Sequence, residues 1–285
     1  MSDWVPSAPC TPAACIGPAD RPVSVPHAAL RLTAVLTLVL AAALVLPAGR
    51  RIPPGVIRRW CRTLVRAAGV RLTLTGAAAA PTGGLLLVAN HVSWLDIPLL
   101  AAVRPARMLA KSDIRHWPVA GALAARGGTL FIDRDRLSTL PHTVGALAEA
   151  LRRGAAVGVF PEGSTWCGRA QGPFRRAAFQ AALDARVPVQ PVHLRYRHTD
   201  GPPSAAPAYI GEDSLLTSVW RVVRTRDLVA EVAVRPPIPP GTHPDRRALA
   251  HAAHPTAPAP RASHPPHQVP APRPTRAPLL RGRTP

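Results

Sequence analysis

Residues 84–96 read GLLLVANHVSWLD, and this stretch decides the fold. Its first part, Gly84–Ala89, is a short uncharged apolar run bounded by turn residues, which is typical of a buried strand. His91 follows on what would be a turn, and Asp96 lies where a helix could begin. The stretch therefore predicts a strand, a turn that carries a histidine, and the first turn of a helix.

Strand and helix candidates alternate along the chain after this stretch. The strand candidates are Arg107–Ala110, Thr129–Ile132, Ala155–Phe160, Val189–Tyr196 and Leu228–Arg235. The helix candidates are Asp113–Ala125, Leu140–Arg153 and Phe174–Ala185. Such alternation predicts an α/β architecture, with a mixed, largely parallel sheet flanked by helices. We expect this domain to occupy residues 55–237.

The two ends of the chain show no apolar period. Prolines recur in residues 1–28, which predicts a disordered leader. Residues 238–285 are rich in Pro, Ala, Arg and His, and they predict a disordered tail that buries no core. The histidines of this tail are weak candidate metal ligands, and a solvated basic tail is the favoured interpretation.

An apolar segment, residues 29–48, separates the leader from the main domain. Its single charge is Arg31, and its length is near the lower limit for a helix that spans a membrane. Six arginines follow it between Arg50 and Arg66, whereas only Arg21 and Arg31 come earlier. The positive-inside rule then predicts a main domain that faces the cytoplasm. The alternative is a buried or half-inserted helix that never crosses.

The formal net charge of +20 favours anionic partners: nucleic acid, an anionic membrane surface or phosphorylated substrates. A basic nucleic-acid-binding protein is therefore the rival class. No zinc finger, RNP block or helix-turn-helix signature is visible in the sequence, and the apolar segment 29–48 fits that class poorly. We expect the membrane as a partner and no nucleic acid.

The chain has four cysteines, Cys10, Cys15, Cys61 and Cys167. They form no CxxC pair, and no group of Cys and His has the usual zinc spacing. We expect reduced thiols, no metal and no tightly bound cofactor.

His91 and Asp96 are the first candidate site. Histidine is the usual general base near neutral pH, and a carboxylate can fix its tautomer and stabilise the imidazolium. Residues five apart do not share a helix face, so the two can meet only if His91 is on the turn and Asp96 in the first helical turn. The alternative is a capping box formed by Ser93 and Asp96, in which His91 is an ordinary loop residue.

Two further segments end predicted strands with polar residues. Residues 128–134 read GTLFIDR, and the guanidinium of Arg134 suits phosphate at a strand end. Residues 160–165 read FPEGST, where Gly163 allows a tight turn and Glu162 could accept hydrogen bonds from acceptor hydroxyls. A surface charge cluster and a plain Pro-x-Gly turn are the respective alternatives. The segment VPVQPV at 187–192 indicates only a strand that forms a wall.

In this order the four blocks resemble the lysophosphatidic acid (1-acyl-glycerol-3-phosphate) acyltransferase family. Its members carry Asn-His-x4-Asp, Gly-x-x-Phe-Ile-Asp-Arg, Phe-Pro-Glu-Gly and Val-Pro-x-x-Pro-Val blocks. The resemblance covers roughly residues 60–235. It implies that His91 and Asp96 are catalytic and that the second and third blocks bind the acceptor. The residues it assigns to binding are Arg134, Glu162, Gly163 and the adjoining Ser164.

One block departs from the family pattern. The third block usually continues Thr-Arg, and here it continues Ser164-Thr165. The missing arginine would have been a second phosphate contact, for which the candidates Arg169, Arg175 and Arg176 lie nearby in the sequence. An acceptor without a glycerol phosphate head, such as a lyso-aminolipid, is therefore the alternative.

The resemblance implies a membrane-associated acyltransferase without a covalent acyl-enzyme. His91 would take the proton of a lysolipid hydroxyl while that oxygen attacks the thioester of acyl-CoA or acyl carrier protein. With 1-acyl-glycerol-3-phosphate as the acceptor, the product is phosphatidic acid. A membrane-associated scaffold with a dead site is a further alternative, which the intact first block disfavours.

Overall fold

The computed structural model describes residues 6–17, 22–45, 52–76, 82–117, 120–134 and 136–254. The chain divides into residues 1–255 and a second unit, residues 256–285, which lies outside the described residues. The first unit is built on a sheet in the order β1-β7-β6-β2-β5-β3-β4. Its strands are β1 Val70–Gly76, β2 Leu85–Ala89, β3 Arg107–Lys111, β4 Leu130–Ile132, β5 Ala156–Val159, β6 Val189–His198 and β7 Leu228–Val234.

All neighbouring strands run parallel except β6 and β7, which pair antiparallel. The expectation of a mixed, largely parallel sheet is therefore confirmed. The α-helices are α1 Pro12–Cys15, α2 Val25–Val45, α3 Pro54–Ala67, α4 Asp96–Val103, α5 Ala120–Arg126, α6 Leu140–Arg152, α7 Ala177–Ala185, α8 Leu215–Arg224 and α9 Arg246–Ala253.

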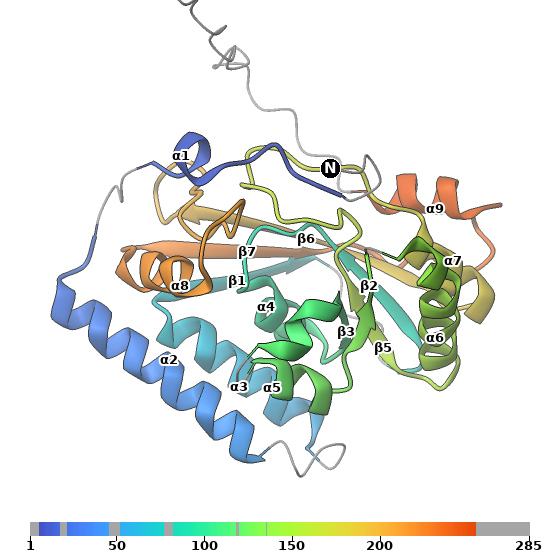
Figure 1. The fold of residues 1–285 in the computed structure, drawn as a ribbon, viewed down its shortest axis with the longest axis horizontal. Coiled ribbons are helices and arrows are strands. Elements are labelled where there is room, and N and C mark those ends of the chain that lie inside the picture. Colours follow the sequence, from blue (N-terminus) through green and yellow to red (C-terminus); the bar gives the residue numbers. More distant parts are fainter. Residues whose placement is uncertain are drawn as a thin grey trace, which may run out of the picture. The chain divides into compact units, whose positions relative to one another are not determined.

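Strand β2 shows why the sheet is covered on both faces (Figure 1). Leu85, Leu87 and Ala89 belong to the apolar cluster formed with α2, α3, α4 and α8. Leu86 and Val88 point to the opposite face and belong to the cluster formed with α6, α7 and α9. Side chains of a strand alternate between faces, so a strand buried on both sides reads as the unbroken run LLLVA.

Three parts of the domain differ from the expected elements. Strand β1 was not predicted, since most of its residues are half-buried or exposed and it lies at the sheet edge. Helix α3 was also not predicted, because arginines interrupt the apolar pattern of its short buried face in the sequence. The helix expected over Asp113–Ala125 is divided into the 3-10 helix η2, Ser112–His116, and α5. Pro118 lies between them in the sequence, and proline removes a helical hydrogen bond.

The chain ends contain more structure than expected. Residues 6–17, part of the segment expected to be a disordered leader, include α1 and the buried Cys10. The apolar helix α2 begins at Val25 instead of residue 29 and is described to Val45. In the expected tail, α9 buries Leu249, Ala250 and Ala253 against the domain. The sequence did not reveal this apolar face, because arginines and a histidine stand among its apolar residues. The rest of that tail, from residue 255, lies outside the described residues.

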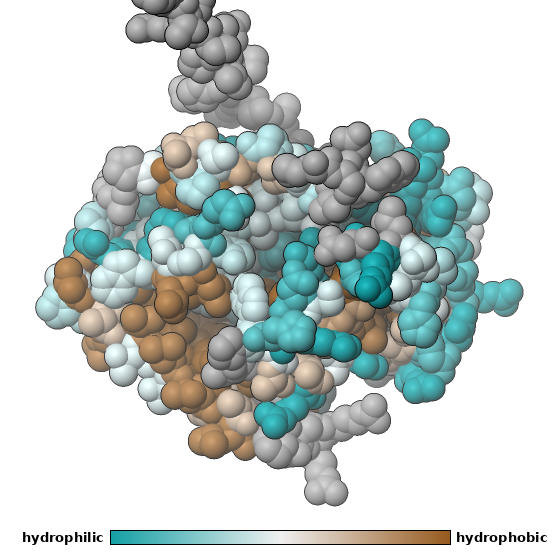
Figure 2. Space-filling view, in the orientation of Figure 1, coloured by the Kyte–Doolittle hydropathy of each residue, from teal (hydrophilic) through white to brown (hydrophobic). Residues whose placement is uncertain are grey.

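Helix α2 is long and apolar enough to cross a membrane, and it is the single such helix among the described residues. Several of its large apolar side chains are exposed, including Leu36 (50%), Leu40 (55%) and Leu44 (81%). In Figure 2 the apolar surface gathers at the lower left, where Figure 1 places α2. In an aqueous environment this face would be in contact with water, which is unfavourable for a stripe of several leucines.

Candidate active site

His91 lies on the turn between β2 and α4, at the carboxyl end of a central strand. Its Nδ1 atom is 2.8 Å from Oδ2 of Asp96, the first residue of α4. The arrangement that the sequence permits for residues five apart is therefore the one that the structure has. With Nδ1 directed at a carboxylate, Nε2 is the nitrogen left to exchange a proton with a substrate. The side chain of His91 keeps 21% of its surface exposed.

Asp96 is completely buried, and donors surround its carboxylate. Oδ2 accepts the backbone N–H groups of Val92 (2.6 Å) and Ser93 (2.8 Å), and Oδ1 accepts the hydroxyl of Tyr196 (2.5 Å). The bond to Ser93 is the one that a capping box would make, so Asp96 both supports the helix start and holds His91. The two sequence interpretations of Asp96 are compatible.

Tyr196 is a site residue that the sequence did not reveal. It lies near the end of β6, far from the first block in the sequence, and its side chain is fully enclosed. Burial and the Asp96 carboxylate raise the pKa of Tyr196 well above its usual value. The phenol therefore stays protonated, and its O–H donates a hydrogen bond to Asp96.

The third block encloses His91 from the other side. The imidazole stacks on Phe160, with ring centroids 4.0 Å apart and an interplanar angle of 9°. The backbone N–H of His91 donates to Oε2 of Glu162 at 2.6 Å, and its carbonyl accepts the N–H of Trp166 at 2.8 Å. These contacts fix the backbone and the ring plane together, which is the preorganisation that a general base requires.

Glu162 has a different position from the one expected for an acceptor-binding residue. It is 3% exposed, and its second oxygen, Oε1, accepts the backbone N–H of Gly172 at 2.9 Å. Both oxygens thus bond to the protein, so the contacts place Glu162 as a bridge between two loops. Burial raises the pKa of Glu162 to about 7, against the opposing effect of the two N–H donors.

This pKa predicts a pH-dependent contribution of Glu162 to stability. The folded state holds the proton more tightly than the unfolded chain, in which the pKa is 4.5. The free energy of unfolding should therefore decrease as pH rises from about 4.5 to 7, by at most about 3 kcal/mol from this group. Denaturant unfolding of wild type and Glu162→Gln at about pH 5 and about pH 8 measures it. Equal pH dependence in both proteins would contradict the assignment.

Arg134 joins the second block to the third. Its Nη1 donates to the carbonyl oxygen of Gly163, in the turn that follows β5. Gly163 has φ = +76°, which favours glycine at this turn, and an added Cβ would lie 2.7 Å from Cγ of Pro6. Burial lowers the pKa of Arg134, although guanidinium still retains its charge near neutral pH. The structure thus brings Arg134 and Gly163 together, as the resemblance implies.

Ser164 and Thr165 occupy the positions where the block departs from the family pattern. Among the described residues, Ser164 has a buried Oγ without a hydrogen-bond partner. The hydroxyl of Thr165 donates to the carbonyl of Tyr209 and supports the loop. Of the residues considered as substitutes for the missing arginine, Arg169, Arg175 and Arg176 are all exposed.

Asn90 and the fourth block form the rear of the site. The amide of Asn90 donates to the carbonyl of Leu194 (3.0 Å) and accepts the Leu194 N–H (2.8 Å). These bonds fasten the end of β2 to β6, at the point where β6 turns to pair with β7. The expectation that block 187–192 forms a wall agrees with its position on β6, where Val189 and Val192 are buried.

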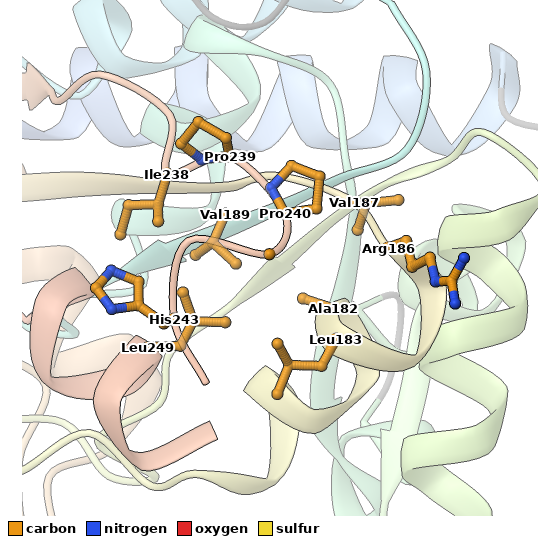
Figure 3. A pocket seen from close by; sticks show the side chains of 11 residues that line it. Ala182, Leu183, Arg186, Val187, Val189, Ile238, Pro239, Pro240, His243 and Leu249 are labelled. Atoms are coloured by element: carbon orange, nitrogen blue, oxygen red, sulfur yellow. The ribbon is translucent and has the colours of Figure 1, made fainter. Parts of the chain in front are cut away.

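A pocket of about 380 Å³ lies elsewhere, between α7, the start of β6 and residues 238–249 (Figure 3). It opens near the amino end of β6, whereas His91 follows the carboxyl end of β2, which runs parallel to β6. None of the residues around His91 lines it. In parallel sheets the carboxyl ends of the strands carry the chemistry, which favours the surroundings of His91 over this pocket as the candidate active site.

Comparison with known proteins gives acyltransferases, the class that the sequence motifs resemble. A family model described as Acyltransferase matches residues 71–195. The lyso-ornithine lipid O-acyltransferase of Pseudomonas aeruginosa is 41% identical over 182 residues, which cover 64% of this chain and 69% of that protein. The 1-acyl-sn-glycerol-3-phosphate acyltransferase of Neisseria meningitidis is 38% identical over 171 residues, covering 60% and 67%.

A solved structure has the same fold. The 1-acyl-sn-glycerophosphate acyltransferase of Thermotoga maritima superposes with a TM-score of 0.62 at 18% identity, covering 80% of this chain and 92% of that one. At this identity the likeness supports the fold alone. Fold and site together define an acyltransferase. With these sequence relatives, the chain belongs to the acyltransferase family that includes 1-acyl-sn-glycerol-3-phosphate and lyso-ornithine lipid acyltransferases.

Proposed function

We propose that the protein transfers a fatty acyl group from acyl-CoA or acyl carrier protein to the free hydroxyl of a lysolipid, with His91 as the general base. The contact between His91 Nδ1 and Asp96 Oδ2 at 2.8 Å carries this proposal. Nε2 of His91 removes the proton of the acceptor hydroxyl while its oxygen attacks the thioester carbonyl. The C–S bond breaks when the tetrahedral intermediate collapses, the leaving thiolate takes the proton back from His91 as the thiol, and no acyl group is attached to the enzyme.

The acceptor is proposed to be 1-acyl-glycerol-3-phosphate, which gives phosphatidic acid. Arg134 supports this choice, because a half-buried guanidinium beside the turn of the third block suits a phosphate. The hydroxyl of Ser164 is a second candidate contact, since its buried Oγ has no partner among the described residues.

A lysolipid without phosphate is the second candidate acceptor. Thr165 favours it, because a threonine bonded to Tyr209 stands where the family usually has a phosphate-binding arginine. The relative from Pseudomonas aeruginosa is named for lyso-ornithine lipid. Parallel assays with both lysolipids, each with labelled acyl-CoA and with labelled acyl carrier protein as donor, are read by mass spectrometry of the products and distinguish these acceptors. If neither lysolipid is acylated, the proposed function is refuted.

The role of Arg134 predicts a specific kinetic change. Arg134→Ala should raise the KM for 1-acyl-glycerol-3-phosphate about 10- to 150-fold, the value of a lost charge-assisted hydrogen bond. The KM for the acyl donor should change little. Arg134→Lys should rescue only part of the loss, because an ammonium cannot reproduce the bidentate guanidinium.

The matched acceptor for this experiment is monoacylglycerol, which lacks only the phosphate. Its slower turnover should respond little to Arg134→Ala. An equal loss with both acceptors would mean that the bond to Gly163 is the whole role of Arg134, and the phosphate contact would have to be abandoned.

We further propose that α2 attaches the enzyme to the membrane with its catalytic domain on the cytoplasmic side. A basic hollow of about 580 Å³ beside α2 supports this orientation, since anionic head groups attract arginine. Its arginines are Arg31, Arg62, Arg66 and Arg71. The nucleic-acid alternative has only the net charge in its favour, and a salt-dependent DNA shift assay tests it.

Replacing the exposed leucines of α2 should release the protein from membranes. Leu36, Leu40 and Leu44 form one stripe, and burial of each leucine stabilises by roughly 1.5–3 kcal/mol. The triple substitution to Asn should move most of the protein from the membrane pellet to the supernatant. Leu216→Asn is the matched control, because Leu216 on α8 is 77% exposed. A triple variant that pellets like wild type would show that the attachment lies elsewhere.

A further inference from the structure

Three of the four cysteines meet behind the candidate active site. The sulfur atoms of Cys10, Cys15 and Cys167 all lie within 4.8 Å of one another, although about 150 residues separate Cys167 from the other two. Cys10 and Cys167 are buried, at 7% and 4% exposure, and Cys15 is half-buried. Cys61, the fourth, is buried elsewhere and serves as an internal comparison.

We propose that Cys10, Cys15 and Cys167 bind one zinc ion, which attaches the N-terminal segment 6–17 to the loop after the Phe-Pro-Glu-Gly block. Three thiolates form a soft ligand set, which zinc accepts in tetrahedral geometry. Zn–S bonds of about 2.3 Å place two sulfurs about 3.8 Å apart, so the observed cluster needs to contract by at most about 1 Å. Small rotations of the side chains accomplish this.

Burial raises the pKa of Cys10 to about 12 and also raises the pKa of Cys15, and backbone N–H groups close to the sulfurs oppose this effect. Backbone N–H groups of Arg169 and Ala170 donate to the Cys167 sulfur. The N–H of Cys167 donates to Cys10, and the N–H of Thr11 donates to Cys15. Such hydrogen bonds orient metal ligands and stabilise their charge. A water molecule takes the fourth position, because the described residues bring no fourth ligand to this cluster.

The N-terminal segment is held to the domain mainly by apolar packing, since Cys10 belongs to the core cluster and Ala8 and Ile16 pack against it. Its backbone bonds from Cys15 to Thr11 and from Ile16 to Pro12 are internal to the segment. Its contacts with the domain include Pro6 against Gly163 and Pro12 against Gly211. A metal shared with Cys167 would link this segment directly to the domain, and metal binding couples to folding.

The position of Cys167 connects this site to catalysis. The preceding residue, Trp166, donates its N–H to the carbonyl of His91 at 2.8 Å. In Figure 1 the N-terminal segment, in blue, lies beside the yellow-green chain that follows β5. A zinc ion bound here would fix the loop that encloses His91.

The sequence did not predict this site. Cys10 and Cys15 are close in the sequence, but two cysteines alone do not define a metal site. The third ligand was visible only after folding. The earlier expectation of no metal is thus the one that this proposal replaces.

The test is metal analysis of the full chain, purified with reduced thiols in detergent and without an oligohistidine tag. Wild type and Cys61→Ser should each carry about one zinc per chain, and Cys10→Ser, Cys15→Ser and Cys167→Ser should each lose at least about tenfold. Cobalt added to chelator-stripped wild type should give intense sulfur-to-metal charge-transfer absorption, which Cys167→Ser should lack. The wild-type arm of this reconstitution tests the site even if the cysteine variants do not fold.

Three results would overturn the proposal. Equal zinc in all variants would place the metal on other groups, such as the histidines near the C-terminus. Failure of stripped, reduced wild type to bind zinc or cobalt would exclude the site. A disulfide between two of the three cysteines, found by mass spectrometry in protein isolated without air, would identify a redox pair instead.

Discussion

Replacement of His91 by alanine should reduce the rate of acyl transfer by about 10²–10⁴ while the protein remains folded. The imidazole is the group placed to accept the proton of the acceptor hydroxyl, with Nδ1 bonded to Asp96 and part of its surface open to solvent. The loss should appear in kcat, because the base acts in the transition state and does not bind the ground state. Steady-state kinetics with a lysolipid and acyl-CoA measure it.

The variant also loses the stacking of His91 on Phe160, so stability must be measured alongside activity. His142→Ala is the matched control, because His142 is exposed on α6 and outside the site. A His91→Ala protein with a wild-type unfolding midpoint and near-normal kcat would sink the proposed mechanism. A fall in kcat that only follows a loss of folded protein would leave His91 with a structural role and would also count against it.

Asp96→Asn should reduce kcat by a comparable factor, about 10²–10⁴, because an amide cannot stabilise the imidazolium as a carboxylate does. The fold should survive this change. The amide oxygen can still accept the N–H groups of Val92 and Ser93, and the amide nitrogen can donate to the hydroxyl of Tyr196. The measurement is kcat together with the unfolding midpoint of the purified variant.

Tyr196→Phe is the comparison variant for Asp96→Asn, because it changes a neighbour of Asp96 and keeps the carboxylate. It removes the donor to Oδ1 and leaves the carboxylate and its bond to His91 in place, so kcat should fall less than in Asp96→Asn. If Asp96→Asn retains near-normal kcat, Asp96 serves only the start of α4. The capping interpretation would then be sufficient.

The sequence predicted the elements that carry strong local signals. Strand β2 is an unbroken apolar run, and α6 ends close to Gly154, so both were located within one or two residues. It missed β1 and α3, whose burial depends on partners distant in the chain. It also misjudged residues 238–254, because the apolar face of α9 becomes evident only against α7 and β6.

The site was predictable to the same extent. The pair His91 and Asp96 is local, and a turn followed by a helix start brings it together. Tyr196 could not be found, because β6 carries it to Asp96 from 100 residues away. The contacts of Glu162 with two backbone N–H groups were not predicted, because they are a property of the folded loops, and its role in acceptor binding stays a prediction.

The most direct test of the central claim is the reaction itself. The purified full-length chain is given acyl-CoA with an isotopically labelled acyl group and a lysolipid, and both the labelled ester and the released thiol are quantified over time. The account predicts labelled diacyl product in equal amount to free CoA, no labelled acyl group on the protein, and loss of both products in His91→Ala. Release of CoA without ester formation, or labelled acyl-enzyme that accumulates in wild type, would contradict it.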